Sequence, residues 1–192
     1  MRRRWALAAI ACGLALALGG CGGGPPPATY DLNASQGKTA AGRLSATLVI
    51  AEPTGVQPVD SDRIVIRTGS ESVAYLAGAQ WSDRLPRLVQ TRLIQTFENA
   101  GLLGRVGRPG LAASHVLQTE LRRFEVDVTR NEAVVEISAK IVTDGASRIV
   151  AAQIFSATSP APATQGGQAA AALDDALGDA MRRILVWTTG RI

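Results

Sequence analysis

Alternation of apolar and polar residues marks several strands in the first half of the chain. A short extended segment is expected at 30–32 and a longer strand over 44–51. Two further runs, 63–67 and 73–77, flank the turn residues Thr68–Glu71, which predicts a β-hairpin. The first half therefore begins as a series of short strands.

The spacing of apolar positions changes to that of a helix after these strands. Over residues 86–100 they recur every three or four positions on one face, which predicts an amphipathic helix. Ser82 or Asp83 is expected to cap its start, and Gly101 is expected to end it. Pro86 is compatible with this helix because N–H groups in the first turn have no intrahelical partner.

A long strand is expected over 116–128, and its apolar positions change parity midway. Leu117 and Leu121 lie on one face by two-residue alternation, whereas Phe124 has the opposite parity. One extra residue near Arg122–Arg123 would return all three side chains to the same face. The sequence therefore predicts a β-bulge at this point.

Two more strands and a second helix complete the pattern. Residues 135–141 alternate regularly, and another strand is expected over 149–156 after the Asp144-Gly145 turn. An unbroken, alanine-rich apolar stripe then predicts a helix over 169–185. The order of strands, helix, strands, helix predicts an α+β fold in which two amphipathic helices pack on an antiparallel-rich sheet.

The N-terminal residues have the three parts of an export signal. Arg2–Arg4 are basic, residues 5–18 are apolar, and Gly19-Gly20 precede Cys21. The apolar part is shorter than the roughly 20 residues that a membrane-spanning helix needs. This length favours a cleaved signal over the alternative, an uncleaved membrane anchor. Small residues before a cysteine resemble the bacterial lipoprotein signal, in which the cysteine is acylated and becomes the first residue of the mature protein.

This resemblance divides the chain into three regions. They are a signal peptide at 1–20, a lipidated cysteine with a glycine- and proline-rich stalk at 21–29, and one α+β domain at 30–192. Diacylglycerol and palmitate on Cys21 would be its covalent lipid. Gly22 follows the cysteine, so no aspartate retention signal is present, and the resemblance implies an outer-membrane lipoprotein whose domain faces the periplasm.

The net charge gives little support to nucleic-acid binding. The whole chain has 20 basic and 16 acidic residues, a net charge of +4. Without Arg2–Arg4 of the signal, 17 basic residues stand against 16 acidic ones, a net charge of +1. A domain so close to neutral lacks the basic excess that marks nucleic-acid binding. No nucleic-acid partner is therefore expected.

The sequence lacks the residues that common catalytic and metal sites require. His115 is the single histidine and no cysteine follows Cys21, which excludes a Cys–His nucleophile and a histidine-based metal site in the exported domain. No Gly-x-Ser-x-Gly elbow presents a serine. Glu125 and Asp127 alternate with apolar residues, as on a solvated strand face. We therefore expect no enzyme, no metal and no cofactor other than the covalent lipid.

A glycine-rich segment at 101–110 follows the first helix. It lacks the Gly-Lys-Ser/Thr signature of a phosphate loop and does not join a strand to a helix. We interpret it as a helix cap and a loop. The alternative is that Arg105 and Arg108 contact anionic headgroups or an acidic partner.

One stretch resembles a known family. Residues 62–67 and 73–76 form a strand pair, Gln80-Trp81-Ser82-Asp83-Arg84-Leu85 follows, and the helix at 86–100 comes next. This order, with the early segment 30–32, resembles the ABC-type transport auxiliary lipoproteins, which are PqiC-like partners of MCE-domain transport systems. Over the second half only the order of elements agrees.

The resemblance implies a non-catalytic adaptor at the outer membrane. Such a protein would dock an MCE-domain protein, with its ABC permease and ATPase, for the movement of lipids or other hydrophobic molecules across the periplasm. Tyr75, Trp81 and Arg84 are the expected contact residues, since aromatic and arginine side chains dominate binding energies. Trp81 could instead pack at the corner between sheet and helix.

Two other functions stay open from the sequence. A lipid-binding carrier domain needs an apolar cavity between sheet and helices, and the alanine-rich stripe could leave room for one or could equally mean close packing. An envelope-assembly lipoprotein without a transporter partner would have the same anchor and the same stalk.

Overall fold

The computed structural model describes most of the expected domain and the end of the stalk. The described residues are 25–36, 44–143, 145, 148–161 and 165–192. The signal peptide and Cys21, both expected from the sequence, lie outside the described residues.

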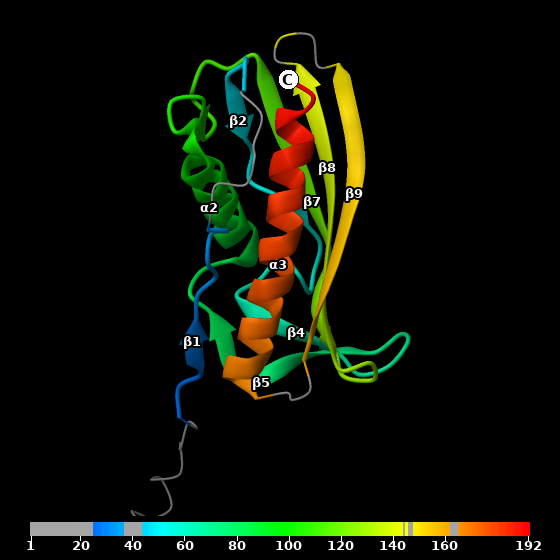
Figure 1. The fold of residues 1–192 in the computed structure, drawn as a ribbon. Coiled ribbons are helices and arrows are strands. Elements are labelled where there is room, and N and C mark those ends of the chain that lie inside the picture. The colour runs from blue at the N-terminus through cyan, green and yellow to red at the C-terminus, as the bar shows by residue number, and fades with distance from the viewer. Residues whose placement is uncertain (1–24, 37–43, 144, 146–147, 162–164) are drawn as a thin grey trace, which may run out of the picture.

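The described residues form a nine-stranded sheet, two α-helices and a short π-helix (Figure 1). The strands are β1 (Ala28–Tyr30), β2 (Leu48–Ile50), β3 (Thr54–Gly55), β4 (Arg63–Arg67), β5 (Val73–Trp81), β6 (Val106–Gly107), β7 (His115–Asp127), β8 (Glu132–Thr143) and β9 (Ile149–Pro160). The helices are α2 (Leu85–Phe97), η2 (Glu98–Leu102) and α3 (Gly166–Thr189). Each predicted strand and helix overlaps one of these elements, and the two-residue strands β3 and β6 were not predicted.

Strand β7 lies at the centre of the sheet. Along one edge it pairs in parallel with β2, β3 and β4, so that Ile50 lies opposite Leu117 and Val65 lies opposite Glu125. Along its other edge it pairs with β8 in antiparallel orientation, and β8 in turn pairs with β9. The three longest strands therefore form an antiparallel meander, and short strands complete the sheet beside it.

The sheet is mixed, and the prediction of an antiparallel-rich sheet is wrong. Five strand pairings are parallel, and three are antiparallel. The parallel partners lie far apart in the sequence, as Ile50 and Leu117 do. Alternation within one strand carries no information on the direction of so distant a partner, because both orientations present the same two faces.

The predicted bulge in β7 is confirmed. The register of the β7–β8 ladder shifts between Leu121 and Arg123. Leu117, Leu121 and Phe124 are all buried, with exposed fractions of 2% or less. The extra residue thus keeps one continuous apolar face along a strand whose sequence changes parity.

The N-cap of helix α2 is Arg84, one residue after Asp83, the later of the two predicted caps. Arg84 occupies the N-cap position, and its side chain makes no capping hydrogen bond. The carboxylate of Asp83 accepts a hydrogen bond from the N–H of Arg84 at 2.7 Å. The N–H of Leu85, the first helical residue, donates to the carbonyl of Ser61 at 2.9 Å. Capping by Ser82 or Asp83 is therefore wrong, because a distant loop supplies the acceptor.

The end of this helix follows the prediction more closely. The α-helix ends at Phe97 and continues as η2, in which Gly101 adopts a φ of 88°. This left-handed conformation favours glycine, and it interrupts the helical geometry at Gly101, one residue before the end of η2.

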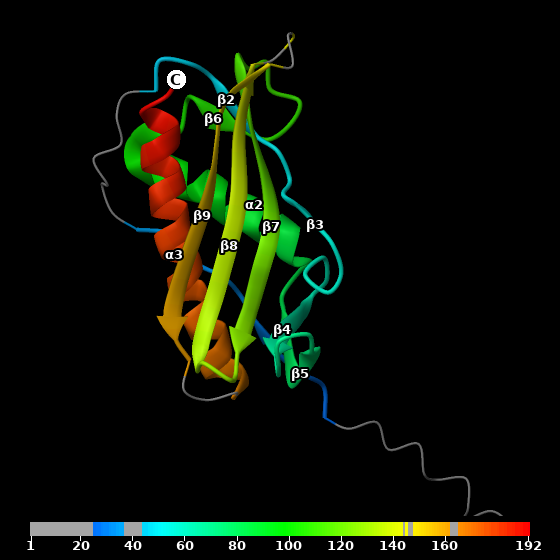
Figure 2. The ribbon, with the colours of Figure 1, turned by 90° about the vertical axis from the view of Figure 1, so that its right-hand side faces the viewer.

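Helices α2 and α3 cover the same face of the sheet, and Figure 2 looks onto the opposite face, where no helix formed by the described residues lies over β7, β8 and β9. Helix α3 packs on β8 and β9 with an alanine-rich stripe. The buried alanines of this stripe include Ala169, Ala172, Ala176 and Ala180. Because alanine is small, the helix approaches the sheet closely, and the alternative of close packing is the one that the structure adopts.

The expected solvated face at Glu125 and Asp127 is also wrong, because both carboxylates are buried. Arg67 and Arg123 each pair with Glu125, at 2.8 and 2.7 Å. Asp127 accepts hydrogen bonds from the hydroxyl and N–H of Thr129, and the hydroxyl bond lowers the pKa of Asp127. Strand β4 lies beside this end of β7 and brings Arg67 to Glu125, a long-range pairing that local alternation does not reveal.

Candidate functional site

The three predicted contact residues lie along one continuous segment but in different environments. Strand β5 carries Tyr75 near its start and Trp81 at its end, and Arg84 immediately precedes α2. Tyr75 is 38% exposed, whereas Trp81 is 1% exposed. Tyr75 is therefore accessible to a partner protein, whereas Trp81 is not.

Trp81 lies in the core at the corner between sheet and helix, which is the alternative position considered for it. Its ring meets the ring of Phe124 edge-on, with centroids 5.9 Å apart. Its backbone N–H donates to the carbonyl of Asp62 at 2.7 Å. Edge-to-face aromatic packing of this kind adds to the free energy of burial, so Trp81 stabilises the fold.

Arg84 is held by two carboxylates. Its guanidinium donates to Asp60 at 2.5 Å and to Glu52 at 3.2 Å. The hydrogen bond to Asp60 raises the pKa of Arg84 above its usual value. Since both carboxylates come from the segment between β2 and β4, Arg84 attaches that segment to the start of α2.

Tyr75 forms a small exposed cluster with two neighbours. The guanidinium of Arg63 lies over its ring, 5.0 Å from the centroid, and its hydroxyl donates to the side-chain oxygen of Gln57 at 3.3 Å. Gln57 in turn donates to the carbonyl of Asp60 at 2.6 Å. We call Tyr75, Arg63, Gln57, Asp60 and Arg84 the hairpin surface.

In the hairpin surface, Tyr75 and Arg84 are connected through a loop whose residues were not among the predicted contact residues. Gln57 and Asp60 belong to the segment between β3 and β4, and no local pattern marks them. Residue type identifies the aromatic and arginine residues, but it does not identify the polar residues Gln57 and Asp60 that fix their side chains. The structure brings two of the three predicted residues onto one surface.

The stalk leaves the domain beside this surface. Strand β1 pairs in parallel with the end of β5, and the N–H of Ser82 donates to the carbonyl of Tyr30 at 2.8 Å. Pro25 and Pro27 line a shallow hollow together with Arg63 and Gly78. The C-terminus lies at the opposite end of the domain (Figure 1). The hairpin surface is thus close to the point where the stalk enters the domain.

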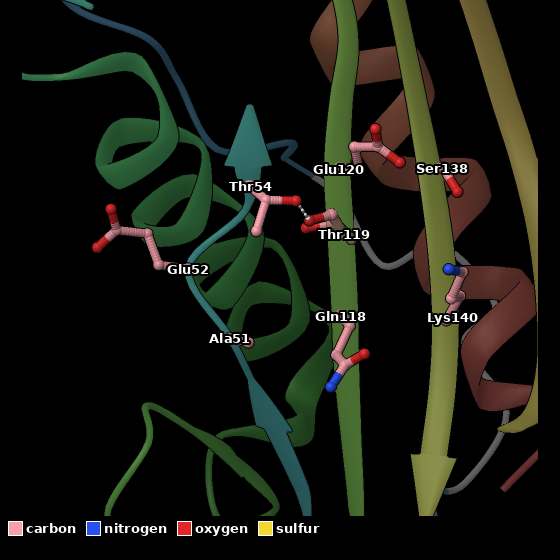
Figure 3. Close-up of a pocket in the computed structure, with 8 residues that line it drawn as sticks. All are labelled: Ala51, Glu52, Thr54, Gln118, Thr119, Glu120, Ser138 and Lys140. Carbon is pink, nitrogen blue, oxygen red and sulfur yellow. Dashed lines mark hydrogen bonds between the residues drawn. The ribbon is translucent and has the colours of Figure 1, made fainter. Parts of the chain in front are cut away.

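A hollow of about 320 Å³ lies on the sheet face that the helices leave open (Figure 3). Gln118 and Glu120 of β7 stand beside Ser138 and Lys140 of β8, and Thr54 closes one side by donating to the carbonyl of Thr119 at 3.5 Å. None of the predicted contact residues lies here.

His115, Arg105 and Arg108, the other residues considered from the sequence, all contact neighbouring residues of the domain. Nδ1 of His115 lies 3.1 Å from the hydroxyl of Ser114. Arg108 donates to the hydroxyl of Thr91 at 2.8 Å, and Arg105 donates to the carbonyl of Ser45 at 3.2 Å. Both arginines therefore attach the glycine-rich segment to the rest of the domain. The segment contains the end of η2 and the short strand β6, which the interpretation as a helix cap and a loop did not include.

The described part of the chain has neither a metal cluster nor a membrane-spanning helix. It contains no group of three or more His, Cys, Asp or Glu residues placed to hold a metal ion. It also contains no helix that is long and apolar enough to span a membrane.

Known proteins resemble this chain over most of its length. The model of a family described as ABC-type transport auxiliary lipoprotein component matches residues 30–185. An uncharacterized protein of Bradyrhizobium diazoefficiens is 34% identical over 174 residues, which cover 87% of this chain and 47% of that protein. The chain therefore spans about half the length of this relative.

Two crystal structures have a similar fold. Protein XCC0632 from Xanthomonas campestris superposes with a TM-score of 0.78 and 25% identity, covering 86% of this chain and 97% of that one. A second structure, of an uncharacterized protein, has a TM-score of 0.69 at 11% identity, covering 85% of this chain and 99% of that one.

The family match extends from Tyr30 at the end of β1, across the Trp81 corner and the meander, to Leu185 in the last turns of α3. The match therefore includes the second half of the domain, where the sequence resembles the family only in the order of its strands and helix. On this evidence the chain belongs to the family of ABC-type transport auxiliary lipoprotein components.

Proposed function

We propose that the protein is an outer-membrane lipoprotein, anchored through lipid on Cys21, that serves as a non-catalytic adaptor of an ABC transport system. Its partners in this proposal are an MCE-domain protein and the associated permease and ATPase, and the cargo is a lipid or another hydrophobic molecule. The observation that carries the proposal is the family match over residues 30–185, which begins nine residues after Cys21.

The entry of the stalk supports the anchored arrangement. The stretch from Cys21 to Ala28 spans at most about 25 Å when fully extended. Because β1 is fixed to β5, a lipid on Cys21 would hold this end of the domain next to the membrane. The hairpin surface would then lie on the membrane-proximal part of the domain.

The packing of α3 favours an adaptor over a lipid carrier. A carrier needs an apolar cavity between sheet and helices. Instead, the alanine-rich stripe of α3 is buried directly against β8 and β9. We therefore assign the contact role to the exposed hairpin surface, with Tyr75 as its aromatic side chain and Arg84 as the residue that positions the neighbouring loop.

Affinity purification of the full-length protein from cross-linked membranes tests this proposal. Wild-type protein is compared with Cys21→Ala, and copurified proteins are identified by mass spectrometry. We expect an MCE-domain protein with its permease and ATPase to copurify with the wild type and to be lost with Cys21→Ala. Confirmed lipidation without any transporter subunit would contradict the adaptor function.

A further inference from the structure

The hollow on the open face of the sheet lies where strand pairing is interrupted (Figure 3). The last pairing of β2 joins Ile50 to Leu117, and the first pairing of β3 joins Thr54 to Glu120, so three residues of one segment stand beside two residues of β7. One of the three is Pro53, which has no N–H to donate to β7. Figure 3 shows the segment curving away from β7 between the two pairings, and this separation opens the hollow.

Two opposite charges line the hollow on neighbouring strands. Glu120 of β7 lies opposite Ser138 of β8, and Gln118 lies opposite Lys140. The two pairs are two residues apart, which is about 7 Å along the strands. Their alternation places all four side chains on the same face of the sheet, as Figure 3 shows. The hollow therefore has a carboxylate at one level and an ammonium group at the next.

Neither of these charges has an ion-pair partner among the described residues. The ion pairs there include neither Glu120 nor Lys140. The third charged residue of the lining, Glu52, is turned away from β7 in Figure 3, and its carboxylate accepts a hydrogen bond from Arg84 at 3.2 Å. The carboxylate of Glu120 and the ammonium group of Lys140 are therefore both available to a ligand in the hollow.

The choice of lysine in this hollow indicates the kind of anion that it would bind. Lys38 and Lys140 are the only lysines among the 20 basic residues of the chain. Every ion pair within the described residues uses arginine, whose planar fork suits a carboxylate. The ammonium group of a lysine is instead a compact point charge that binds phosphate. The amide of Gln118, opposite Lys140, adds a donor for the anion, and the hydroxyl of Ser138, opposite Glu120, adds an acceptor for a cation.

We propose that the hollow binds a compact zwitterion in which a primary ammonium group and a phosphate are joined by a short alkyl chain. The ammonium group lies at Glu120 and Ser138, and the phosphate lies at Lys140 and Gln118. The volume of about 320 Å³ is near the lower limit for ligand pockets, so the hollow holds a group of this size and not a whole lipid. Such an aminoalkyl phosphate exists both as a free molecule and as the headgroup of a lipid.

Titration of the full-length protein with phosphoethanolamine in a non-ionic detergent tests the proposal, with binding followed by saturation-transfer NMR of the ligand. Ethanolamine and methyl phosphate, which each have one of the two charges, are the control ligands. Because Glu120 and Lys140 are exposed, each contact contributes modestly. We expect a Kd on the order of 1 mM for the zwitterion and at least about fivefold weaker binding of either control ligand. No binding of the zwitterion, or equal binding of all three molecules, would overturn the inference.

Variants of the two charged residues locate the binding in the hollow. Glu120→Gln and Lys140→Met should each weaken phosphoethanolamine binding about fivefold or more. Glu71→Gln makes the same chemical change at an exposed position between β4 and β5, and it should bind as the wild type does. All three positions are exposed, so thermal unfolding should stay unchanged. The double variant Glu120→Lys with Lys140→Glu exchanges the charges and should bind the zwitterion, reversed, more tightly than either single variant. Wild-type affinity in both single variants would overturn the proposal.

A second titration, with sn-glycero-3-phosphoethanolamine, distinguishes the two sources of the ligand. This diester has the headgroup of a lipid without its acyl chains. Binding at least as tight as that of phosphoethanolamine supports the proposal with a lipid headgroup as the ligand. Binding of phosphoethanolamine alone supports it with a free aminoalkyl phosphate, and binding of neither overturns it. These titrations use the purified protein by itself, so their outcome does not depend on whether transporter subunits copurify in the test of the proposed function.

Discussion

Strand β5 connects two regions that are held together by different forces. At its end, Trp81 packs against Phe124 in an apolar corner beneath α2. At its start, the β4–β5 hairpin joins the end of β7, where Glu125 is buried between Arg67 and Arg123. We call these regions the apolar corner and the charged end. The first depends on shape and burial, whereas the second depends on charge and hydrogen bonds, so they should respond differently to mutation and to pH.

The largest effect is expected at the apolar corner. Trp81→Ala removes a side chain that is 1% exposed and leaves a cavity beside Phe124. It should lower the free energy of unfolding by about 3–5 kcal/mol, measured by chemical denaturation. Trp81→Phe should recover part of the loss. A loss below about 1 kcal/mol for the alanine variant would show that the corner is not tightly packed.

The next effect is expected at the charged end. Glu125→Gln removes the carboxylate charge that two arginines share. Removal of one partner from a buried ion pair is costly, but Arg67 and Arg123 are 26% and 32% exposed, so water compensates part of the cost. We expect a loss of about 1–3 kcal/mol. Glu136→Gln, which affects the more exposed pair with Arg122, is the control and should change stability less.

A smaller and pH-dependent effect is expected at Asp127. The Thr129 hydroxyl lowers the pKa of this carboxyl below its ordinary value of 3.8. The resulting stabilisation is present above pH 3.8 and is lost as the pH falls through the lowered pKa of the folded state. Thr129→Val removes the hydroxyl, so the wild type should exceed the variant in thermal stability at neutral pH, and the difference should shrink toward pH 2. A difference that stays constant with pH would contradict this role.

The smallest effect on stability is expected at Tyr75. Its ring is 38% exposed, so Tyr75→Ala should change the free energy of unfolding by no more than about 0.5–1 kcal/mol. If the hairpin surface binds a partner, the same variant should reduce recovery of transporter subunits. Val73→Ala, at a neighbouring exposed position, serves as the control. Equal recovery with both variants and the wild type would remove Tyr75 from the proposed contact surface.

The contrast between these regions also explains which features the sequence predicts well. The extent of β4, the bulge in β7 and the stripe of α3 depend on local periodicity, and the structure confirms them. The burial of Glu125 depends on Arg67, which arrives on a strand that lies far away in sequence. Local alternation cannot report such a partner, and the same limit accounts for the parallel strand pairings.

The residues of the candidate site were also predicted only as far as local sequence reveals them. Sequence reasoning selects Tyr75, Trp81 and Arg84 by residue type, and residue type alone does not separate a buried tryptophan from an exposed tyrosine. The carboxylate of Asp60, which holds Arg84, lies in a loop without periodicity. Strand β9 was expected from the sequence, but its pairing with β8 alone among the described residues is a property of the whole sheet.

The attachment of β1 has a mechanical consequence. Its three residues, Ala28–Tyr30, lie parallel to β5 and directly follow residues 25–27 of the stalk (Figure 1). A pull on the stalk would load the bonds between β1 and β5 in shear, so that they share the force instead of breaking one after another. Tyr30 also lies against the start of α3, where a side chain at Gly166 would come within 3.0 Å of its hydroxyl. Tension on the residues before β1 would therefore reach the sheet and the longest helix together, through this one short strand.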